Sequence, residues 1–322
     1  MKKTIILAIL ILAGSVSLYL LSASREIRTS GAFVTDVFVE LKARGTEAGT
    51  AEAFYIAMDE IRDIDTRLGY RNSLVDKLNR EYFLKDREVY SLIQLGREIR
   101  SASSGAFSIT LRSISDSWGF TGLHPYRVPS QEEFDAWKKS PKDESVILHG
   151  DGMSIEMPEG ASIDLGGLME GYAADQACAA MRSCGIDAGL ANVGGEVMAF
   201  GSRTWKVGLK NPRGEGVFAV IPLKNSAVAT SGDYERFFFS GTRRYCHTLD
   251  PSTSMPASRL MSATVIAPSC TLANAWAVAL FVAGPEKLGP VLEKKGFDWV
   301  VVDLKGTVRS STAMRQYCPM KI

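Results

Sequence analysis

Residues 163 to 172 read Ile-Asp-Leu-Gly-Gly-Leu-Met-Glu-Gly-Tyr, and they join an apolar stretch ending in a carboxylate to two glycines and a helical pattern. The first turn of a helix has free backbone N–H groups, which can face a phosphate or be capped by an acid. Asp164 is therefore either a cap for a helix over residues 166–184 or a residue that holds a ligand.

On both sides of this junction, strand-like and helix-like patterns occupy separate stretches. Alternation predicts a half-buried strand at 31–41, and short apolar runs punctuated by glycine predict further strands at 146–148, 154–157, 193–200, 205–209, 217–223, 234–239 and 299–302. Helical spacing predicts helices at 51–68, 88–103, 130–137, 166–184, 271–282 and 285–295. This arrangement favours an α+β fold over a doubly wound sheet. The chain also lacks the glycine motifs of dinucleotide-binding and P-loop folds.

The composition limits the possible partners. The 322 residues are 46% hydrophobic and 23% charged, as expected of a globular protein with a sizeable core. Lys and Arg number 37 against 36 acids, so the net charge of +1 gives no sign of nucleic-acid binding. The three histidines, His124, His149 and His247, lie at no metal-ligand spacing, which makes a zinc enzyme a poor candidate.

The N-terminus has the pattern of an export segment. Lys2 and Lys3 precede an apolar stretch from Ile5 to Leu21, which predicts a signal peptide or short membrane anchor over residues 1–24 and a functional domain over 25–322. No cysteine follows the stretch, so the protein is not expected to be a lipoprotein. We expect it in the periplasm or on the extracytoplasmic face of the inner membrane. There, the five cysteines could form two pairs, whose identity stays open, although most are expected to be buried as small hydrophobic residues.

Two further segments carry residues suited to chemistry. Tyr245–Pro251 contains His247, which is either structural or the best general-base candidate in the chain. Ala227–Arg236 combines small residues with Thr and Ser hydroxyls, and it is either a ligand contact or a plain turn entering a strand.

These segments, in this order, resemble the FAD:protein FMN transferase family, ApbE. Further motifs that carry the resemblance are Asn192–Glu196, Ser262–Ala267, Tyr70, Gly105–Thr110 and Trp118–Phe120. The resemblance implies an α+β fold with mixed or antiparallel sheets flanked by helices and an FAD cleft between the two halves. It also implies Mg²⁺-dependent transfer of FMN from FAD to a Thr or Ser of an acceptor protein, with release of AMP. The acceptor would carry Asp-x-x-Ser/Thr-Gly-Ala-Ser/Thr and would be a membrane electron-transfer subunit.

The resemblance assigns roles to particular residues. His247 would be catalytic, the carbonyl of Gly167 would face the metal, and Asn274 and Val278 occupy the positions of the two side-chain metal ligands. The residues expected to contact FAD are Ser30, Tyr70, Ala106, Phe107, Ser108, Asp164, Glu170 and Thr248.

Several of these positions depart from the family's residue types. Asn274 and Val278 replace an Asp and a Thr that bind the metal, Glu170 replaces a Lys, and Ser108 replaces an Asp. Ser30 and Ala32 stand where the family begins with Met-Gly-Thr. A metal site that lacks one carboxylate and one hydroxyl should bind Mg²⁺ more weakly. The alternatives are therefore a non-catalytic relative that binds FAD or a partner protein, and an FAD pyrophosphatase.

Overall fold

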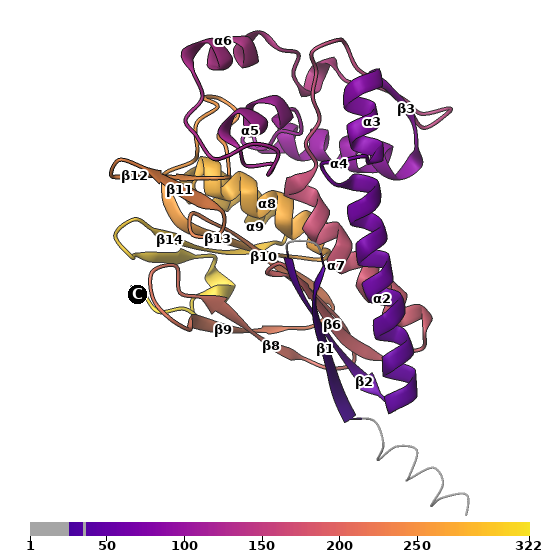
Figure 1. Cartoon of the computed structure of the whole chain (residues 1–322). Helices are drawn as coiled ribbons and strands as arrows, with labels where there is room; N and C mark the ends of the chain where they lie inside the picture. Colours follow the sequence, from indigo (N-terminus) through magenta and orange to yellow (C-terminus); the bar gives the residue numbers. More distant parts are fainter. Residues whose placement is uncertain (1–25, 35–36) are drawn as a thin grey trace, which may run out of the picture.

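A single eight-stranded antiparallel sheet organises the chain in the computed structural model, which describes residues 26–34 and 37–322 (Figure 1). The segment predicted to direct export lies outside the described residues. The strand order is β1-β2-β6-β7-β10-β13-β14-β15. These strands are β1 (Glu26–Val34), β2 (Val37–Gly45), β6 (Ala188–Val193), β7 (Glu196–Gly201), β10 (Ser226–Gly232), β13 (Leu260–Ala267), β14 (Asp298–Asp303) and β15 (Val308–Ser310).

The other strands form three small sheets. They are β3 (Phe83–Lys85), β5 (Ser154–Glu156) and β4 (Ile147–His149); β8 (Trp205–Lys210) with β9 (Val217–Leu223); and β11 (Phe237–Ser240) with β12 (Arg243–Cys246). The α-helices are α2 (Glu47–Leu68), α3 (Leu74–Glu81), α4 (Arg87–Ala102), α5 (Arg112–Trp118), α6 (Gln131–Lys139), α7 (Gly166–Ser183), α8 (Cys270–Ala283) and α9 (Pro285–Lys294). Two short 3-10 helices are η1 (Asp143–Ser145) and η2 (Thr312–Met314). The mixture confirms the predicted α+β class.

The sheet lies between two layers. Helices α2, α7 and α8 cover one face, where the main core forms, and the β8–β9 hairpin packs on the other face (Figure 1). Helices α3 to α6 and the β3-β5-β4 sheet lie above the α7–α8 end of these layers (Figure 1). The chain thus brings the N-terminal half over one end of the sheet-and-helix sandwich.

Helix α8 begins against helix α7, and a partly buried carboxylate of α7 caps the start of α8. Asp175 of α7 accepts hydrogen bonds from the Cys270 N–H at 2.7 Å and the Thr271 N–H at 2.9 Å. A carboxylate at a helix start satisfies free N–H groups and interacts favourably with the helix dipole. Gly171 faces the same place, because a Cβ built on it would lie 2.3 Å from the Cys270 carbonyl oxygen. The two helices approach closely because Gly171 has no side chain.

Some predicted strands were wrong in detail. Residues 31–41 are not one strand but the two arms of the β1–β2 hairpin, in which Val34 pairs with Val37. The alternation continues across the hairpin and so hides the reversal. Residues 193–200 contain the end of β6 and most of β7, joined at Gly194 and Gly195, whose φ angles of 68° and 116° let the chain turn back.

Other elements also differ from the sequence prediction. The first part of Ala227–Arg236, a segment weighed as a ligand contact or a turn, belongs to the central strand β10, and the strand predicted at 234–239 begins only at Phe237. Helix α3 was not predicted, because its eight residues include only a short apolar stripe. All five cysteines are free, and three of them are buried. Among the described residues, no helix is long and apolar enough to span a membrane.

The contact at Gly171 gives a stability prediction. Gly171→Ala should lower the free energy of unfolding by about 1–3 kcal/mol, because the new methyl group meets backbone that can move only with α8. Urea unfolding followed by circular dichroism measures the change. Gly150→Ala is the control, because the nearest atom to its added Cβ is 3.7 Å away. Equal stability of the two variants would contradict the close helix contact.

Candidate active site

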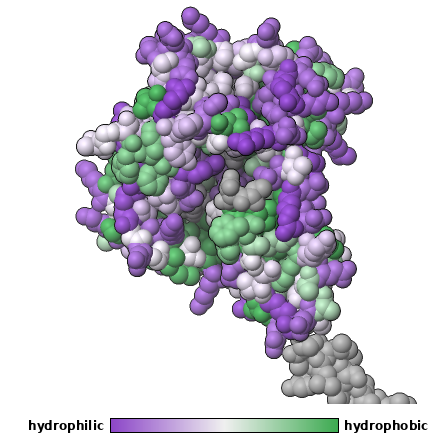
Figure 2. Space-filling model, viewed as in Figure 1, coloured by the Kyte–Doolittle hydropathy of each residue, from purple (hydrophilic) through white to green (hydrophobic). Residues whose placement is uncertain are grey.

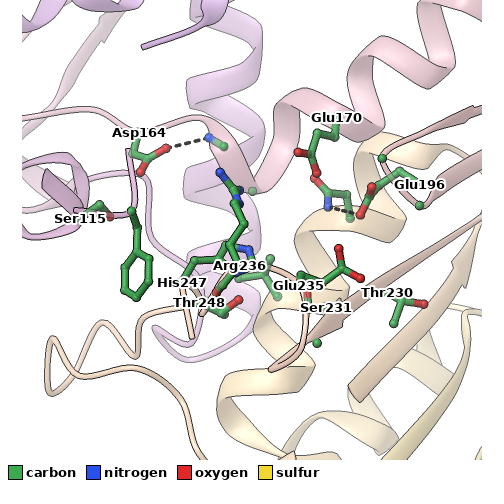
Figure 3. A pocket seen from close by; sticks show the side chains of 18 of the residues that line it. Ser115, Asp164, Glu170, Glu196, Thr230, Ser231, Glu235, Arg236, His247 and Thr248 are labelled. Atoms are coloured by element: carbon green, nitrogen blue, oxygen red, sulfur yellow. Dashed lines mark hydrogen bonds between the residues drawn. The ribbon is translucent and has the colours of Figure 1, made fainter. Parts of the chain in front are cut away.

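A polar cleft of about 480 Å³ opens where the N-terminal half meets the sheet and helices α7 and α8 (Figure 3). Its walls come from the turn at 107–108, the start of α7, the β6–β7 turn, the end of β10, residues 247–249 and α8. The volume is typical of a small-molecule site.

The rim of the cleft is apolar on one side. Hydrophobic residues gather at the tip of the β1–β2 hairpin, beside a hollow in the surface (Figure 2). Phe33 and Phe38 are exposed there with their rings packed edge to face, and Phe38 also lines the cleft.

Most of the site residues predicted from the sequence meet in this cleft. Those that line it are Tyr70, Phe107, Ser108, Asp164, Gly167, Glu170, His247, Thr248, Asn274 and Val278. Ser30 instead lines a separate surface hollow with Arg28 and Arg62, and Ala106 is buried but does not line the cleft. The assignment of FAD contacts to these residues stays a prediction.

Asp164 is held in place by the residues around it. It accepts hydrogen bonds from the Gly166 N–H at 2.8 Å and from the Tyr70 hydroxyl at 3.2 Å, so it caps the start of α7 and fixes Tyr70 at once. Arg112 holds Tyr70 from the other side, by a 3.0 Å hydrogen bond to its carbonyl and by a cation–π contact of 4.7 Å. Burial and the nearby carboxylate raise the pKa of Tyr70, so its hydroxyl remains a donor.

The turn that carries Ser108 is fixed by a carboxylate from a distant part of the chain. Buried Asp143 accepts hydrogen bonds from the Ile109 N–H at 2.9 Å, the Thr110 hydroxyl at 2.6 Å and the Ser108 hydroxyl. Although Ser108 replaces an acidic residue of the family pattern, the turn still contacts a carboxylate, that of Asp143.

His247 is neutral in this environment. Its backbone N–H donates to the Arg236 carbonyl oxygen at 2.9 Å, and its Nδ1 lies 3.3 Å from the same oxygen. Burial, together with the Arg236 charge, lowers the pKa of His247 to about 3. If Nδ1 carries the ring proton and donates to that carbonyl, Nε2 keeps its lone pair and is free to accept a proton.

Arg236 lines the cleft and ends the segment Ala227–Arg236, but it was not among the predicted site residues. Its side chain extends into the cleft between Asp164 and Glu170 (Figure 3). Among the residues that line this cleft it is the only Lys or Arg. Burial alone would lower the pKa of Arg236, but the surrounding acidic groups, Glu170 and Asp164 among them, raise it above its ordinary value. A pyrophosphate ligand needs a cationic side chain beside it, and a search for such a side chain in the quoted segments could have identified Arg236.

The inner wall of the cleft contains oxygen atoms without hydrogen-bond partners. The Asn274 amide nitrogen donates to Glu196 Oε1 at 3.3 Å, while Asn274 Oδ1 and Glu196 Oε2 are buried with no partner among the described residues. Such oxygens fit a hard divalent cation, whereas Val278 offers no ligand atom. In the described part of the chain, no group of three or more His, Cys, Asp or Glu side chains is placed to hold a metal ion. Any metal here must therefore use amide, carbonyl or ligand oxygens as well.

The fold and the cleft define an α+β protein with a polar site of small-molecule size. The ApbE family model matches residues 35–301, and the chain belongs to this family. The chain is 31% identical over 227 residues to the FAD:protein FMN transferase of Escherichia coli strain K12, a match that covers 67% of this chain and 64% of the relative.

Solved structures agree with this assignment. The crystal structure of the ApbE protein of Thermotoga maritima is 30% identical, with a TM-score of 0.85 over 91% of this chain and 100% of that chain. The Pseudomonas stutzeri flavinyl transferase ApbE, 24% identical, has the same fold, with a TM-score of 0.81 over 92% of this chain and 98% of that chain.

The lowered pKa of His247 predicts a pH dependence of stability. The ordinary value of 6.5 applies to the unfolded chain and about 3 to the folded one, so the unfolded state binds more protons between these values. The His247 contribution to the unfolding free energy therefore falls as the pH drops through 6.5. Relative to His247→Asn, the wild type should lose about 1–2 kcal/mol between pH 7 and pH 5.

Chemical unfolding at the two pH values tests this difference. His149→Asn removes an exposed histidine that pairs with Glu156, and it should change with pH as the wild type does. A His247→Asn variant that follows the wild type across the same range would show that His247 is not held neutral.

Proposed function

We propose that the protein is an FAD:protein FMN transferase that binds FAD in the cleft and transfers FMN to a Thr or Ser of an acceptor protein. The observation that carries the proposal is a neutral His247 beside Arg236 in a cleft of this family's fold. The chain spans 64% of the length of the Escherichia coli relative that it matches, so activity, substrate and acceptor are all part of the proposal.

The chain's own groups suit each part of this reaction. His247 would accept the proton of the acceptor hydroxyl as its oxygen bonds to the FMN phosphorus, while the bond from that phosphorus to the AMP oxygen breaks. Arg236 would hold the pyrophosphate, and the Tyr70–Asp164 pair would fix the wall opposite. The acceptor then carries FMN through a phosphoester bond. AMP leaves with the oxygen that bridged the two phosphorus atoms.

A divalent cation such as Mg²⁺ would supply positive charge against the phosphate oxygens when bound. By family position the Gly167 carbonyl and Asn274 Oδ1 would hold it, and the unpartnered Asn274 oxygen supports that role. Val278 favours the second candidate function, a relative that binds FAD without transferring FMN, because an isopropyl group cannot replace a metal-binding hydroxyl.

We also propose an extracytoplasmic location and an acceptor in a membrane electron-transfer subunit with the Asp-x-x-Ser/Thr-Gly-Ala-Ser/Thr pattern. The basic and apolar pattern of residues 1–24 supports the location. The exposed Phe33 and Phe38 at the rim of the cleft offer an apolar surface to an incoming protein.

Transfer is tested by intact mass spectrometry of an acceptor domain carrying Asp-x-x-Thr-Gly-Ala-Thr, incubated with the full-length protein, FAD and Mg²⁺. We expect a mass gain of one FMN residue, and a rate lowered about 10²–10⁴-fold in His247→Asn, because the variant loses the proton acceptor.

The same reaction separates the alternatives. His149→Asn, the matched histidine variant outside the cleft, should transfer at the wild-type rate. Free FMN and AMP with an unchanged acceptor would indicate a pyrophosphatase. FAD binding without either product would indicate the non-catalytic relative.

Arg236 gives a prediction for binding alone. Arg236→Ala should weaken FAD binding about 10–100-fold, because charged hydrogen bonds to the pyrophosphate are lost. Flavin fluorescence titration measures the dissociation constant, and Arg309→Ala, which removes an exposed arginine paired with Glu286, serves as the control. Equal FAD affinity in both variants would remove Arg236 from the phosphate site.

A further inference from the structure

A second groove, of about 440 Å³, adjoins the cleft on the face of the sheet that the β8–β9 hairpin covers (Figure 1). The residues that line both hollows are Asn192, Gly194, Gly195, Thr230 and Glu235. The groove therefore runs up to the cleft beside the β6–β7 turn and the end of β10, and it offers a second approach to the cleft.

Strand β8 presents its free edge to this groove. The consecutive residues 206–210 of β8 all line it, whereas none of the residues of β9 does. Side chains of a strand alternate between its two faces, so a run of neighbours can line one hollow only when the strand lies edge-on to it. Among the described residues β8 pairs with β9 alone, and its other edge therefore carries backbone N–H and C=O groups without strand partners.

Pro222 of β9 identifies which backbone groups of β8 point into the groove. It lies opposite Lys206, and a proline has no N–H to give to a hydrogen-bonded pair. The N–H and C=O groups of Lys206, and of Gly208 two residues on, therefore point away from β9. An extended chain laid beside them would add a third strand to the hairpin, which is a common way for proteins to bind peptides.

The side chains around the groove suit a segment of alternating character. Lys206 and Lys210 lie on the same face of β8, and Lys206 is exposed, with no ion pair within the described part of the chain. The sheet supplies an apolar floor of Leu190, Val197 and Val228. A segment that alternates acidic and apolar residues would place its acids beside the lysines and its apolar side chains over the floor.

The charge of the groove differs from that of the cleft. The cleft is lined by four carboxyl groups and one guanidinium, and the groove by three lysines and two glutamates. Glu40 lies 3.0 Å from the Nζ of the third lysine, Lys42, and so compensates it. Burial raises the pKa of the other glutamate, Glu235, which disfavours its charged form. The lysines of β8 are therefore available to an acidic ligand.

We propose that an extended segment of the acceptor protein, in which acidic and apolar residues alternate, binds in this groove by pairing with the free edge of β8. Only the identity of this segment as part of the acceptor rests on the proposed function. From the wall that the two hollows share, at Gly195 and Thr230, the acceptor chain would continue into the cleft. Its hydroxyl would then approach His247.

The test of the groove uses the full-length protein without FAD. The probe is a fluorescein-labelled peptide of four Asp-Val repeats, and fluorescence anisotropy measures its dissociation constant. We expect saturable binding, at least about tenfold weaker for a peptide of four Lys-Val repeats, because its charges repel the lysines of the groove. No saturable binding of the Asp-Val peptide, or equal binding of the two peptides, would overturn the proposal.

Two pairs of variants separate charge from backbone pairing. Lys206→Glu should weaken peptide binding at least about fivefold, whereas Lys224→Glu, which reverses an exposed lysine outside the groove, should change it less than about twofold. Gly208→Pro should weaken it at least about tenfold, because it removes one N–H of the edge. Gly208→Ala is its control, because it adds the same Cβ beside the exposed Val217 side chain and keeps the N–H.

Unchanged FAD affinity and thermal unfolding show that each variant is folded. Equal losses of peptide binding within either pair of variants would overturn the pairing of an acidic segment with β8. Vesicles of phosphatidylglycerol that bind where the peptide does not would assign the lysines to a membrane surface and would overturn it as well.

The transfer reaction tests whether the acceptor is the occupant. Lys206→Glu and Gly208→Pro should raise the KM for the acceptor domain about tenfold and leave kcat unchanged, because they remove binding outside the reacting centre. An unchanged KM in both variants would exclude the acceptor from the groove. If the Asp-Val peptide binds as expected and the wild type transfers no FMN, the proposed function fails while the groove stands.

Discussion

The close approach of α7 and α8 is the constraint on which the cleft depends. Gly171 permits it by presenting no side chain to the Cys270 carbonyl, and Asp175 holds it by capping the start of α8. Glu170 directly precedes Gly171, and Asn274 lies one turn beyond Cys270, so the same contact brings them to one wall. One turn earlier on α7, Gly167 faces Val278, whose methyl carbon is 3.6 Å from the position of a Cβ on Gly167. The spacing of the candidate metal ligands is thus set by helix packing.

The carboxyl groups in the cleft and behind its wall divide according to their partners. Asp164 caps α7 and accepts from Tyr70, and Asp143 accepts from three donors in the Ser108 turn, so both are committed to holding the backbone. Burial and the neighbouring carboxyl raise the pKa of Glu196 well above its ordinary value, because too few donors compensate it. Groups that the fold satisfies are structural, and groups that it leaves unsatisfied are the ones available to a ligand.

The sequence was sufficient for the fold class, the long helices and most of the cleft residues, because these depend on local periodicity and on motifs. It was insufficient where two segments with the same alternation are joined by a turn, as in the β1–β2 hairpin, since periodicity does not mark the reversal. It also placed Ser30 with the FAD contacts, whereas the structure puts it in another hollow on the outer strand. Arg236 and Glu196 were within quoted segments, yet only tertiary packing shows that their side chains reach the cleft.

The residues that depart from the family pattern have to be considered together with their neighbours in the structure. Ser108 removes an acid from its turn, but Asp143, 35 residues away, accepts hydrogen bonds from that turn. Asn274 taken alone weakens a cation site, and Glu170 taken alone repels a phosphate. Glu170 does not act alone, because its carboxyl group interacts with both Glu196 and the Arg236 guanidinium in the same cleft. The altered residues therefore have to be judged together with the side chains that the fold places beside them.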